Sequence, residues 1–268
     1  MEKIAVLGAG KIGEALLSGL LSSGRSADEL LFTERYPKRC DELTEQYGIT
    51  ATDVPGAVRE AEVLVVAVKP QDVDPLLDEL AEHLRGAGEL RLVVSLCAGL
   101  PTSKFSERLP EGTPVVRVMP NTPMLVGAGM CAISAGPNAT EEHLGGVEQM
   151  LRSVGEVVRV PETQQDAVTA LSGSGPAYFF YLVEAMIDAG ILLGIPRATA
   201  TQLIVQAAVG SAKMLAEEAE HPVLMREAVT SPGGTTIMAI RELERHGVRA
   251  ALIDAIEAAR DRSLELGS

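Results

Sequence analysis

The amino-acid sequence predicts an α/β domain with a doubly wound parallel sheet, followed by a domain made only of helices. Residues 3–160 alternate short β-branched apolar runs with amphipathic helical stretches, which is typical of a parallel sheet covered by helices on both faces. From Leu171 onward the pattern is helical throughout. A chain of 268 residues also exceeds the usual size of one hydrophobic core. We therefore expect two domains, at residues 1–160 and 161–268.

The strands are expected where apolar runs are unbroken by polar alternation, as in strands that are covered on both faces. Such runs lie at residues 4–7, 30–33, 63–68, 92–96 and 115–118. A further strand at 130–134, a helix at about 141–153 and a strand at 156–160 would complete the first domain.

The helices of the second domain are expected at residues 177–193, 198–219, 234–246 and 249–266, because prolines and glycines interrupt the helical pattern between them. They carry apolar residues on more than one face, and the first includes Phe179, Phe180 and Met186. A lone domain of about 100 residues buries too little surface to cover all of these side chains. We expect burial against another subunit, which makes the protein a homo-oligomer.

The charge balance and the spacing of cysteines and histidines argue against several classes of function. A net charge of −14 and a pI near 4.8 disfavour a nucleic-acid or anionic-membrane surface, since both need clustered Lys and Arg. The three cysteines and four histidines lack metal-ligand spacing, so we expect no metal. We expect a cytoplasmic protein for three reasons. The cysteine count is odd, and no apolar run reaches the length of a membrane span. The chain also enters a strand directly after Met1-Glu2-Lys3, without a signal peptide.

A glycine-rich turn lies between the first expected strand and the helix that follows it. After Leu7, the residues Gly8-Ala9-Gly10-Lys11-Ile12-Gly13 match the pattern G-x-G-x-x-G. Gly8 permits the tight turn, Gly10 lets the backbone approach a pyrophosphate, and Gly13 lets helix and strand pack closely. A structural glycine turn is the alternative, but the place of the motif in the first βαβ unit favours a Rossmann-type cofactor site.

The end of the second expected strand carries conflicting indications about the cofactor. Thr33-Glu34-Arg35 lies about 20 residues after the last glycine of the turn, where an acidic residue would bind the ribose 2′-hydroxyl of NADH. Arg35, Lys38 and Arg39 instead offer cations to the 2′-phosphate of NADPH. A solvated, charged helix start is the alternative explanation for Lys38 and Arg39. We expect NADPH, with NADH as the alternative.

Three further segments follow expected strands at the carboxyl edge of the sheet, where ligands bind in doubly wound folds. They are Ala67-Val68-Lys69-Pro70, Leu96-Cys97-Ala98 and Met119-Pro120-Asn121-Thr122-Pro123. Small residues and fixed prolines suit a flat ring lying against backbone, so we expect the first two segments and Asn121 to contact the cofactor. The alternative interpretation of Lys69 is a surface lysine at the end of a strand. Cys97 is expected to pack rather than to act as a nucleophile, because no histidine lies in a nearby motif.

Two segments of the helical domain have the composition of ligand loops. The loop Thr230-Ser231-Pro232-Gly233-Gly234-Thr235-Thr236 interrupts two helical stretches. Hydroxyls and glycines at a helix N-terminus leave backbone N–H groups free, which makes a cradle for a small anion. Leu171-Ser172-Gly173-Ser174-Gly175-Pro176-Ala177-Tyr178 opens the first helix, and it is either part of a ligand site or a glycine-rich joint between domains.

Five motifs, in the same order over nearly the whole chain, resemble the pyrroline-5-carboxylate reductase family. They are GAGKIG from Gly8, AVKP from Ala67, MPNTP from Met119, LSGSGPAY from Leu171, and the stretch from Leu224 to Glu244 centred on TSPGGTT. Related dehydrogenases of 3-hydroxy acids carry a catalytic lysine where this chain has Phe179. Without that lysine the chain lacks their catalytic acid/base, so it resembles these dehydrogenases less closely than the reductases.

The resemblance implies a Rossmann domain followed by a helical dimerisation domain, with dimers that often assemble into decamers. It also implies hydride transfer from a nicotinamide to the C=N bond of pyrroline-5-carboxylate, giving proline. Thr236 would face the ring nitrogen as a hydrogen-bond partner, and Glu162 is the position expected for a further substrate contact. The residues implied to hold the substrate carboxylate are Ser231, Gly233, Gly234, Thr235 and Thr236.

Two departures weaken a direct transfer of the family's cofactor contacts. Some relatives carry Asn where this chain has Val54 beside Asp53, and some carry Asn where it has Ala228. The alternatives to this interpretation are another imine reductase, a dehydrogenase of 3-hydroxy acids, and a nucleotide sensor without catalysis. A sensor would not require the glycines and hydroxyls of the 230–236 loop.

Overall fold

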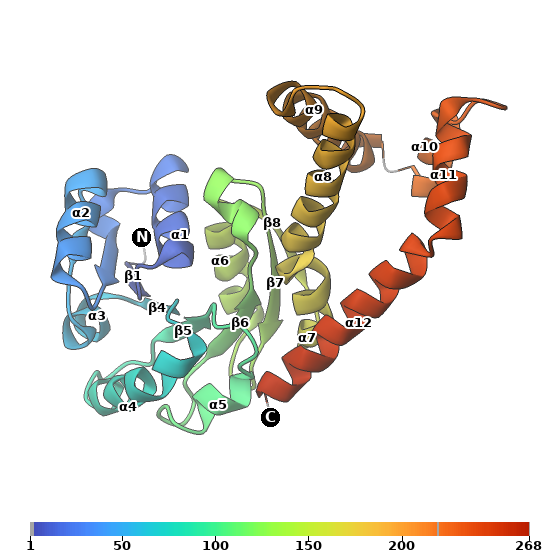
Figure 1. The fold of residues 1–268 in the computed structure, drawn as a ribbon. Helices are drawn as coiled ribbons and strands as arrows, with labels where there is room; N and C mark the ends of the chain where they lie inside the picture. Colours follow the sequence, from blue (N-terminus) through green and yellow to red (C-terminus); the bar gives the residue numbers. More distant parts are fainter. Residues whose placement is uncertain (1–2, 219, 268) are drawn as a thin grey trace. The chain divides into compact units, whose positions relative to one another are not determined.

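The chain folds into two compact units in a computed structural model that describes residues 3–218 and 220–267 (Figure 1). Unit 1 comprises Met1–Ser174 together with Ala259–Ser268, and unit 2 comprises Gly175–Ala258. Some positions named in the expectations, Met1-Glu2, Ala219 and Ser268, lie outside the described residues.

Unit 1 is built on an eight-stranded sheet with the order β3-β2-β1-β4-β5-β6-β7-β8. β1 pairs in parallel with both β2 and β4, and parallel pairing continues through β5 to β6. The strand order therefore reverses beside β1, which places a ligand crevice at the carboxyl ends of β1 and β4. The strands are β1 Ile4–Leu7, β2 Leu30–Thr33, β3 Thr50–Ala51, β4 Val63–Val66, β5 Leu92–Ser95, β6 Val115–Met119, β7 Gly129–Ala135 and β8 Gly155–Arg159.

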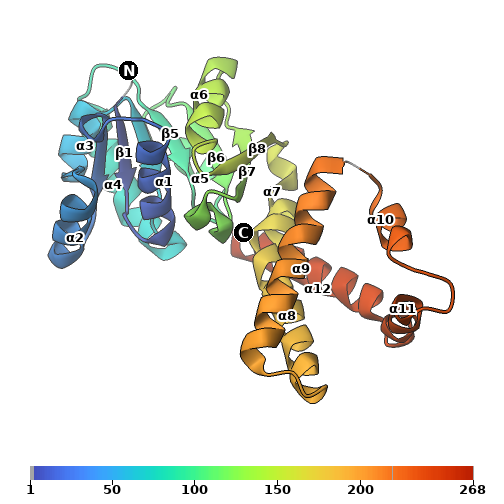
Figure 2. The same cartoon turned by 90° about the horizontal axis from the view of Figure 1, so that it is seen from above.

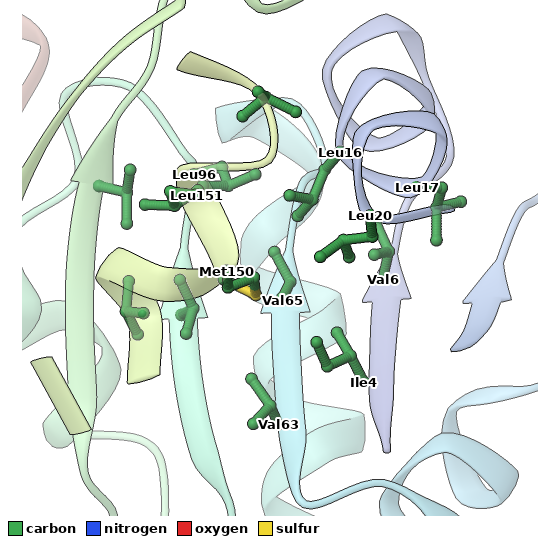
Figure 3. Packing of buried hydrophobic residues seen from close by; sticks show 14 of the residues in the cluster. Ile4, Val6, Leu16, Leu17, Leu20, Val63, Val65, Leu96, Met150 and Leu151 are labelled. Carbon is green, nitrogen blue, oxygen red and sulfur yellow. The ribbon is translucent and has the colours of Figure 1, made fainter. Parts of the chain in front are cut away.

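Helices cover both faces of this sheet (Figure 1). Figure 3 shows Ile4 and Val6 of β1 on the same side as Leu16 of α1, and all three are buried. Ala5 and Leu7 point the other way, towards α3 and α4, because successive strand residues face opposite sides of a sheet. The helices of unit 1 are α1 Lys11–Ser22, α2 Pro37–Tyr47, α3 Val54–Glu60, α4 Val73–Leu84, α5 Thr102–Ser106, α6 Glu141–Leu151 and α7 Gln165–Val168.

One pairing departs from the expected parallel sheet, because β7 runs antiparallel to β6 and parallel to β8. Residues 120–128 alone connect β6 to β7. A parallel pair needs a crossover of about a dozen residues or more, and this connection is too short for one. Helix α6 provides such a crossover between β7 and β8. The expected last strands are thus present, and one of them is reversed.

The two units divide later in the chain than the expected boundary at residues 160 and 161. After α7, a π-helical turn follows at Thr169–Gly173. The buried Gln165 donates hydrogen bonds from Nε2 to the carbonyl of Ala132 at 3.2 Å and to Ser134 Oγ at 2.8 Å, both on β7. Helix α12, Val248–Gly267, begins in unit 2 and ends in unit 1, where Ser263 Oγ donates to Asp166 Oδ1 at 2.6 Å. These hydrogen bonds hold both segments on unit 1.

Unit 2 contains α8 Gly175–Leu192, α9 Arg197–Glu218, α10 Pro222–Ala228, α11 Thr235–Arg245 and the first half of α12. Helices α8 and α9 pack closely where Gly190 meets Ala200. Helices α10 and α11 lie apart from them in both views (Figures 1 and 2). Large apolar side chains are exposed along α8, where Phe180 is 64% and Leu192 is 88% exposed. This surplus of apolar surface is the one that the sequence predicts.

One helical stretch, Glu162–Leu192, is long and apolar enough to cross a membrane by length and composition, with a mean hydropathy of 1.2. The sequence shows no unbroken apolar run of that length, but a helix with a few charges also meets this test. A single such helix is weak evidence for a membrane segment, because an apolar helix that packs against protein passes equally well.

Candidate functional site

The glycine turn after β1 has the backbone geometry that a dinucleotide site needs. Gly8 has φ +98°, a conformation that other residues rarely adopt. A methyl group at Gly13 would overlap the carbonyl oxygen of Gly8, so close contact of helix and strand requires glycine there. At Gly10 the added atom would meet nothing within 4 Å, which leaves this backbone open to a ligand.

Helix α1 starts without a side-chain cap among the described residues. Its N-cap is Gly10, in an extended conformation, and no side chain accepts from the first turn of backbone N–H groups. Unpaired N–H groups and the helix dipole favour an anion at this end. The site therefore fits the diphosphate of a dinucleotide.

A cavity of about 900 Å³ opens at this edge of the sheet. The predicted cofactor residues that line it are Gly8, Ala9, Gly10, Thr33, Glu34, Arg35, Ala67, Val68 and Lys69. The predicted residues beside it that do not line it are Leu7, Lys11, Ile12, Gly13 and Pro70.

The cavity is also lined by residues that the sequence motifs do not indicate. They come from the residue before α2, the segment after β3, and the chain from Gln71 into α4, and are Tyr36, Thr52, Asp53, Val54, Gln71, Asp72, Pro75, Leu76 and Glu79. The chain after each parallel strand reaches the same sheet edge, and that rule applied to β3 would have found Thr52. Strand β3 itself is two exposed residues without an apolar run, so the sequence did not reveal it.

Charged side chains at the cavity pair with one another. Arg35 donates to Asp72 Oδ1 at 2.9 Å, and this hydrogen bond raises the pKa of the guanidinium above its ordinary value. Arg39 pairs with Glu14 of α1 and reaches Glu42 at 3.4 Å. The cations expected to meet a 2′-phosphate are thus already bound to carboxylates. Their role in cofactor recognition stays a prediction.

The segment after β5 places its three predicted residues differently. Leu96 and Cys97 are buried, and Ala98 is exposed. Burial raises the pKa of the Cys97 thiol to about 11, and its Sγ donates to the carbonyl of Val68 at 3.4 Å. A neutral, buried thiol fits the predicted packing role. Within this segment Ala98 is the exposed residue, and it is the part that a ligand can reach.

Asn121, predicted to contact the cofactor, uses both ends of its side-chain amide on the protein backbone. Its Nδ2 donates to the carbonyl of Ser172 at 3.1 Å, and its Oδ1 accepts from the N–H of Met130 at 2.8 Å. The amide thus ties the π-helical turn to the loop after β6. Gly173 lies against Met119 at the same place, where a methyl group would overlap the Met119 side chain. The structure gives Asn121 a positioning role at the sheet edge.

Glu162, predicted to touch the substrate, has both carboxylate oxygens engaged within unit 1. Oε1 accepts from the backbone N–H of Thr102 at 2.7 Å, and Oε2 accepts from the Thr102 hydroxyl at 2.7 Å. Arg117, whose side chain is 6% exposed, reaches Oε1 at 3.4 Å. The carboxylate therefore caps α5 and neutralises a buried cation of β6. Its expected contact with substrate has no support in these partners.

The 230–236 loop of unit 2 has the form of the predicted anion cradle. Gly233 has φ +67°, and a methyl group at Gly234 would overlap Ser231 Oγ. Thr230 Oγ1 donates to the carbonyl of Arg226 at 2.6 Å, which fixes the loop to the end of α10. Helix α11 begins after Gly234, and within the described chain no side chain caps its first turn. Free N–H groups thus lie beside the hydroxyls of Thr235 and Thr236.

The fold and these two loops define a class of protein: a nicotinamide-dinucleotide oxidoreductase with a helical second domain. Comparison with known families gives two matches. Residues 162–266 match the model described as pyrroline-5-carboxylate reductase dimerisation, and residues 3–99 match the one described as NADP oxidoreductase, coenzyme F420-dependent.

Individual relatives narrow the class to one family. The chain is 46% identical to the pyrroline-5-carboxylate reductase of Mycobacterium tuberculosis, over 99% of this chain and 97% of that protein. It is similar to the solved reductase of Coxiella burnetii, with a TM-score of 0.94, 35% identity and coverage of 100% and 99%. The Plasmodium falciparum enzyme, solved with NADP bound, gives a TM-score of 0.88 at 28% identity, covering 100% of this chain and 98% of that one. The chain belongs to the pyrroline-5-carboxylate reductase family.

Proposed function

We propose that this protein reduces pyrroline-5-carboxylate to proline with a reduced nicotinamide dinucleotide. One observation carries the proposal: the chain combines a dinucleotide-type glycine turn with a helix start rich in glycine and hydroxyls, and among the described residues no side chain caps either helix. The first helix start can bind the diphosphate of the cofactor, and the second can bind the smaller carboxylate of the substrate. Identity over nearly the full length to reductases of this name supports the assignment.

In unit 2, the start of α11 would hold the substrate carboxylate. The backbone N–H groups after Gly234 and the hydroxyls of Ser231 and Thr235 are the donors for it. The Thr236 hydroxyl would accept a hydrogen bond from the protonated ring nitrogen and orient the C=N bond. An unperturbed hydroxyl is too weak an acid to supply the proton, and the imine nitrogen is itself protonated near neutral pH. Catalysis then rests on orientation and on oriented dipoles.

In unit 1, the start of α1 would hold the cofactor diphosphate, and the edge of the sheet at Ala98 would support the nicotinamide. When bound, the nicotinamide supplies a hydride to the imine carbon. Asn121 would keep the Leu171–Ser174 segment in place beside it, since its amide holds Ser172. NADPH is the cofactor that the sequence leads us to expect, and NADH is the alternative.

The assembly proposed is a homo-oligomer, either a dimer or a decamer built of dimers, located in the cytoplasm and not in a membrane. The exposed apolar surface of α8 and the family match to a dimerisation domain support a homo-oligomer. We propose that the substrate loop works at a site shared between subunits. Sedimentation at assay concentration tests this, because a fully active monomer would contradict a shared site.

The activity is tested with the purified full-length chain, pyrroline-5-carboxylate, and NADPH or NADH. We expect loss of the absorbance of the reduced cofactor and formation of proline in equal amounts. The same assay with other cyclic imines and with 3-hydroxy acids separates the competing enzyme hypotheses. Cofactor binding without oxidation of either cofactor would favour the nucleotide sensor over the reductase.

A further inference from the structure

We propose that the last turn of α12 positions the nicotinamide part of the cofactor, because it holds the backbone of the loop that follows β5. The helix residues involved are Ser263, Leu266 and Gly267, and the loop residues are Ala98 and Gly99. The inference rests on the proposed function, since it requires that a nicotinamide dinucleotide binds with its ring against Ala98. The three helix residues are positioning residues, which act through the loop and not by contact with the cofactor.

The end of α12 and the loop meet backbone to backbone. Gly99 is buried and has φ +76°, a conformation that glycine adopts readily. A methyl group on Gly267 would lie 2.6 Å from the carbonyl oxygen of Gly99, so the helix packs directly on that carbonyl. A methyl group on Gly99 would lie 3.8 Å from Cβ of Leu266. The last turn of α12 therefore covers Gly99 and leaves the preceding residue, Ala98, exposed.

The last turn of α12 is itself fixed to α7. Ser263 is 5% exposed, and its Oγ donates to Asp166 Oδ1 at 2.6 Å. Figure 1 shows this end of α12 beside α7. A hydrogen bond to a carboxylate is among the stronger ones in proteins, and here it is largely shielded from water. It keeps the helix end from sliding along the Gly99 carbonyl.

The same segment of the chain also holds the far end of the loop. Glu162, four residues before Asp166, accepts from the backbone N–H and from the hydroxyl of Thr102, both at 2.7 Å. On the near side, the buried Cys97 donates to the carbonyl of Val68. Between residues 96 and 102 Ala98 is the exposed residue, and the backbone is fixed before and after it.

A fixed backbone matters here because a flat ring would lie against it, so the position of the loop would set the position of the ring. Hydride transfer requires the two reacting carbons in close, aligned approach, and a misplacement of about 1 Å costs about 100-fold in rate. A loop that is already ordered also loses no further conformational freedom when the cofactor binds. The end of α12 would thus affect the ring of the cofactor and not its diphosphate, which lies at the start of α1.

The test measures the affinity of the full-length protein for a whole cofactor and for the same molecule without its nicotinamide. The pairs are NADPH with 2′-phospho-ADP-ribose, and NADH with ADP-ribose, and calorimetry gives the dissociation constants. In Gly267→Ala the new methyl group must push the helix or the Gly99 carbonyl aside. We expect the dissociation constant of the whole cofactor to rise about three- to tenfold, and that of the ring-free molecule to stay within about twofold. Turnover with pyrroline-5-carboxylate should fall about 10- to 100-fold.

Three further variants separate positioning from a general loss of stability. Gly146→Ala on α6 adds the same methyl group to a helical glycine, and among the described residues nothing lies within 4 Å of it, so binding and turnover should match wild type. Ser263→Ala releases the helix end without adding a group to the contact, and should cause the same change at a smaller size. Asp166→Asn keeps an oxygen for the Ser263 hydroxyl and should bind both molecules nearly as wild type does.

The outcomes distinguish this inference from the proposed function. If wild type binds none of the four molecules, the proposed function fails. If wild type binds and oxidises the cofactor, but Gly267→Ala and Ser263→Ala weaken the whole and the ring-free molecule equally, the reductase stands and the positioning role of α12 is wrong. The same conclusion follows if these variants lower only the free energy of unfolding in urea and leave all dissociation constants and turnover unchanged.

Discussion

Replacing Glu162 with alanine removes the carboxylate that faces the buried Arg117. Two hydrogen bonds from Thr102, each 2.7 Å long, are lost as well. Breaking a fully buried ion pair by removing one partner costs about 3–5 kcal/mol. Because the Glu162 side chain is 29% exposed, water can reach part of the gap, and we expect about 2–3 kcal/mol of lost unfolding free energy. Glu162→Gln keeps one acceptor oxygen for the Thr102 N–H and removes the charge, so it should lose about half as much.

Urea unfolding followed by circular dichroism, at fixed subunit concentration, measures this loss. Glu156→Ala, at an exposed glutamate of β8, is the control and should unfold like wild type. Steady-state kinetics with pyrroline-5-carboxylate run alongside. If Glu162→Ala unfolds at the wild-type urea concentration while KM for the imine rises tenfold, Glu162 contacts substrate, as the family resemblance implies. Our argument from Thr102 and Arg117 would then be wrong.

The other predictions concern the two loops and the thiols. Thr236→Ala should slow turnover severalfold to about a thousandfold, and Thr236→Ser should restore part of it, since one oriented hydrogen bond is at stake; an unchanged kcat/KM in Thr236→Ala removes this residue from the mechanism. Gly13→Ala should lose about 1–3 kcal/mol of stability, because its methyl group meets a backbone oxygen. Gly10→Ala should unfold like wild type and lose dinucleotide affinity, which denaturation and calorimetry would distinguish. Cys97 and Cys131, whose thiol pKa burial raises to about 11, should resist iodoacetamide at about pH 8 until the chain is unfolded, as mass spectrometry would show. The raised thiol pKa also contributes to the free energy of unfolding: the contribution is present below the ordinary thiol pKa and is lost as the pH rises towards 11. Labelling of Cys97 in the native protein at neutral pH would refute the prediction that these thiols are protected.

The sequence predicts best those features that local chemistry determines. The glycines of the first turn each meet a steric demand that is visible in the motif, and the structure shows the same demands at Gly8 and Gly13. Four helices of the second domain lie within two residues of their expected limits, because glycine and proline end or start them. Helix α10 was not expected, since Pro222 looks like an interruption although proline is also favoured in the first helical turn.

The sequence predicts less well which partner a polar side chain takes. Glu162 and Asn121 stand beside recognisable motifs, and a side chain in such a place looks the same whether it binds a ligand or the backbone. Their partners, Thr102 and Ser172, are about 50 to 60 residues away in the chain and become neighbours only through the sheet. The reversal of strand β7, in contrast, can be predicted from the sequence. The 120–128 connection is too short for a parallel pair.

The helix starts of this chain differ in whether a side chain caps them. Helices α3 and α6 carry their own side-chain caps, Asp53 and Thr140, and Glu162 supplies a distant one to α5. Within the described residues, no side chain caps α1, α2, α4 or α11, and of these α1 and α11 have glycine at the N-cap. Glycine at this position costs only a few tenths of a kcal/mol relative to a capping residue, so both helices lose little stability. A serine or aspartate there would satisfy the same N–H groups that a diphosphate or a carboxylate needs, and would compete with the ligand. Leaving these two ends open therefore favours binding at almost no cost to the fold, which is why they are the places where we expect the cofactor and the substrate.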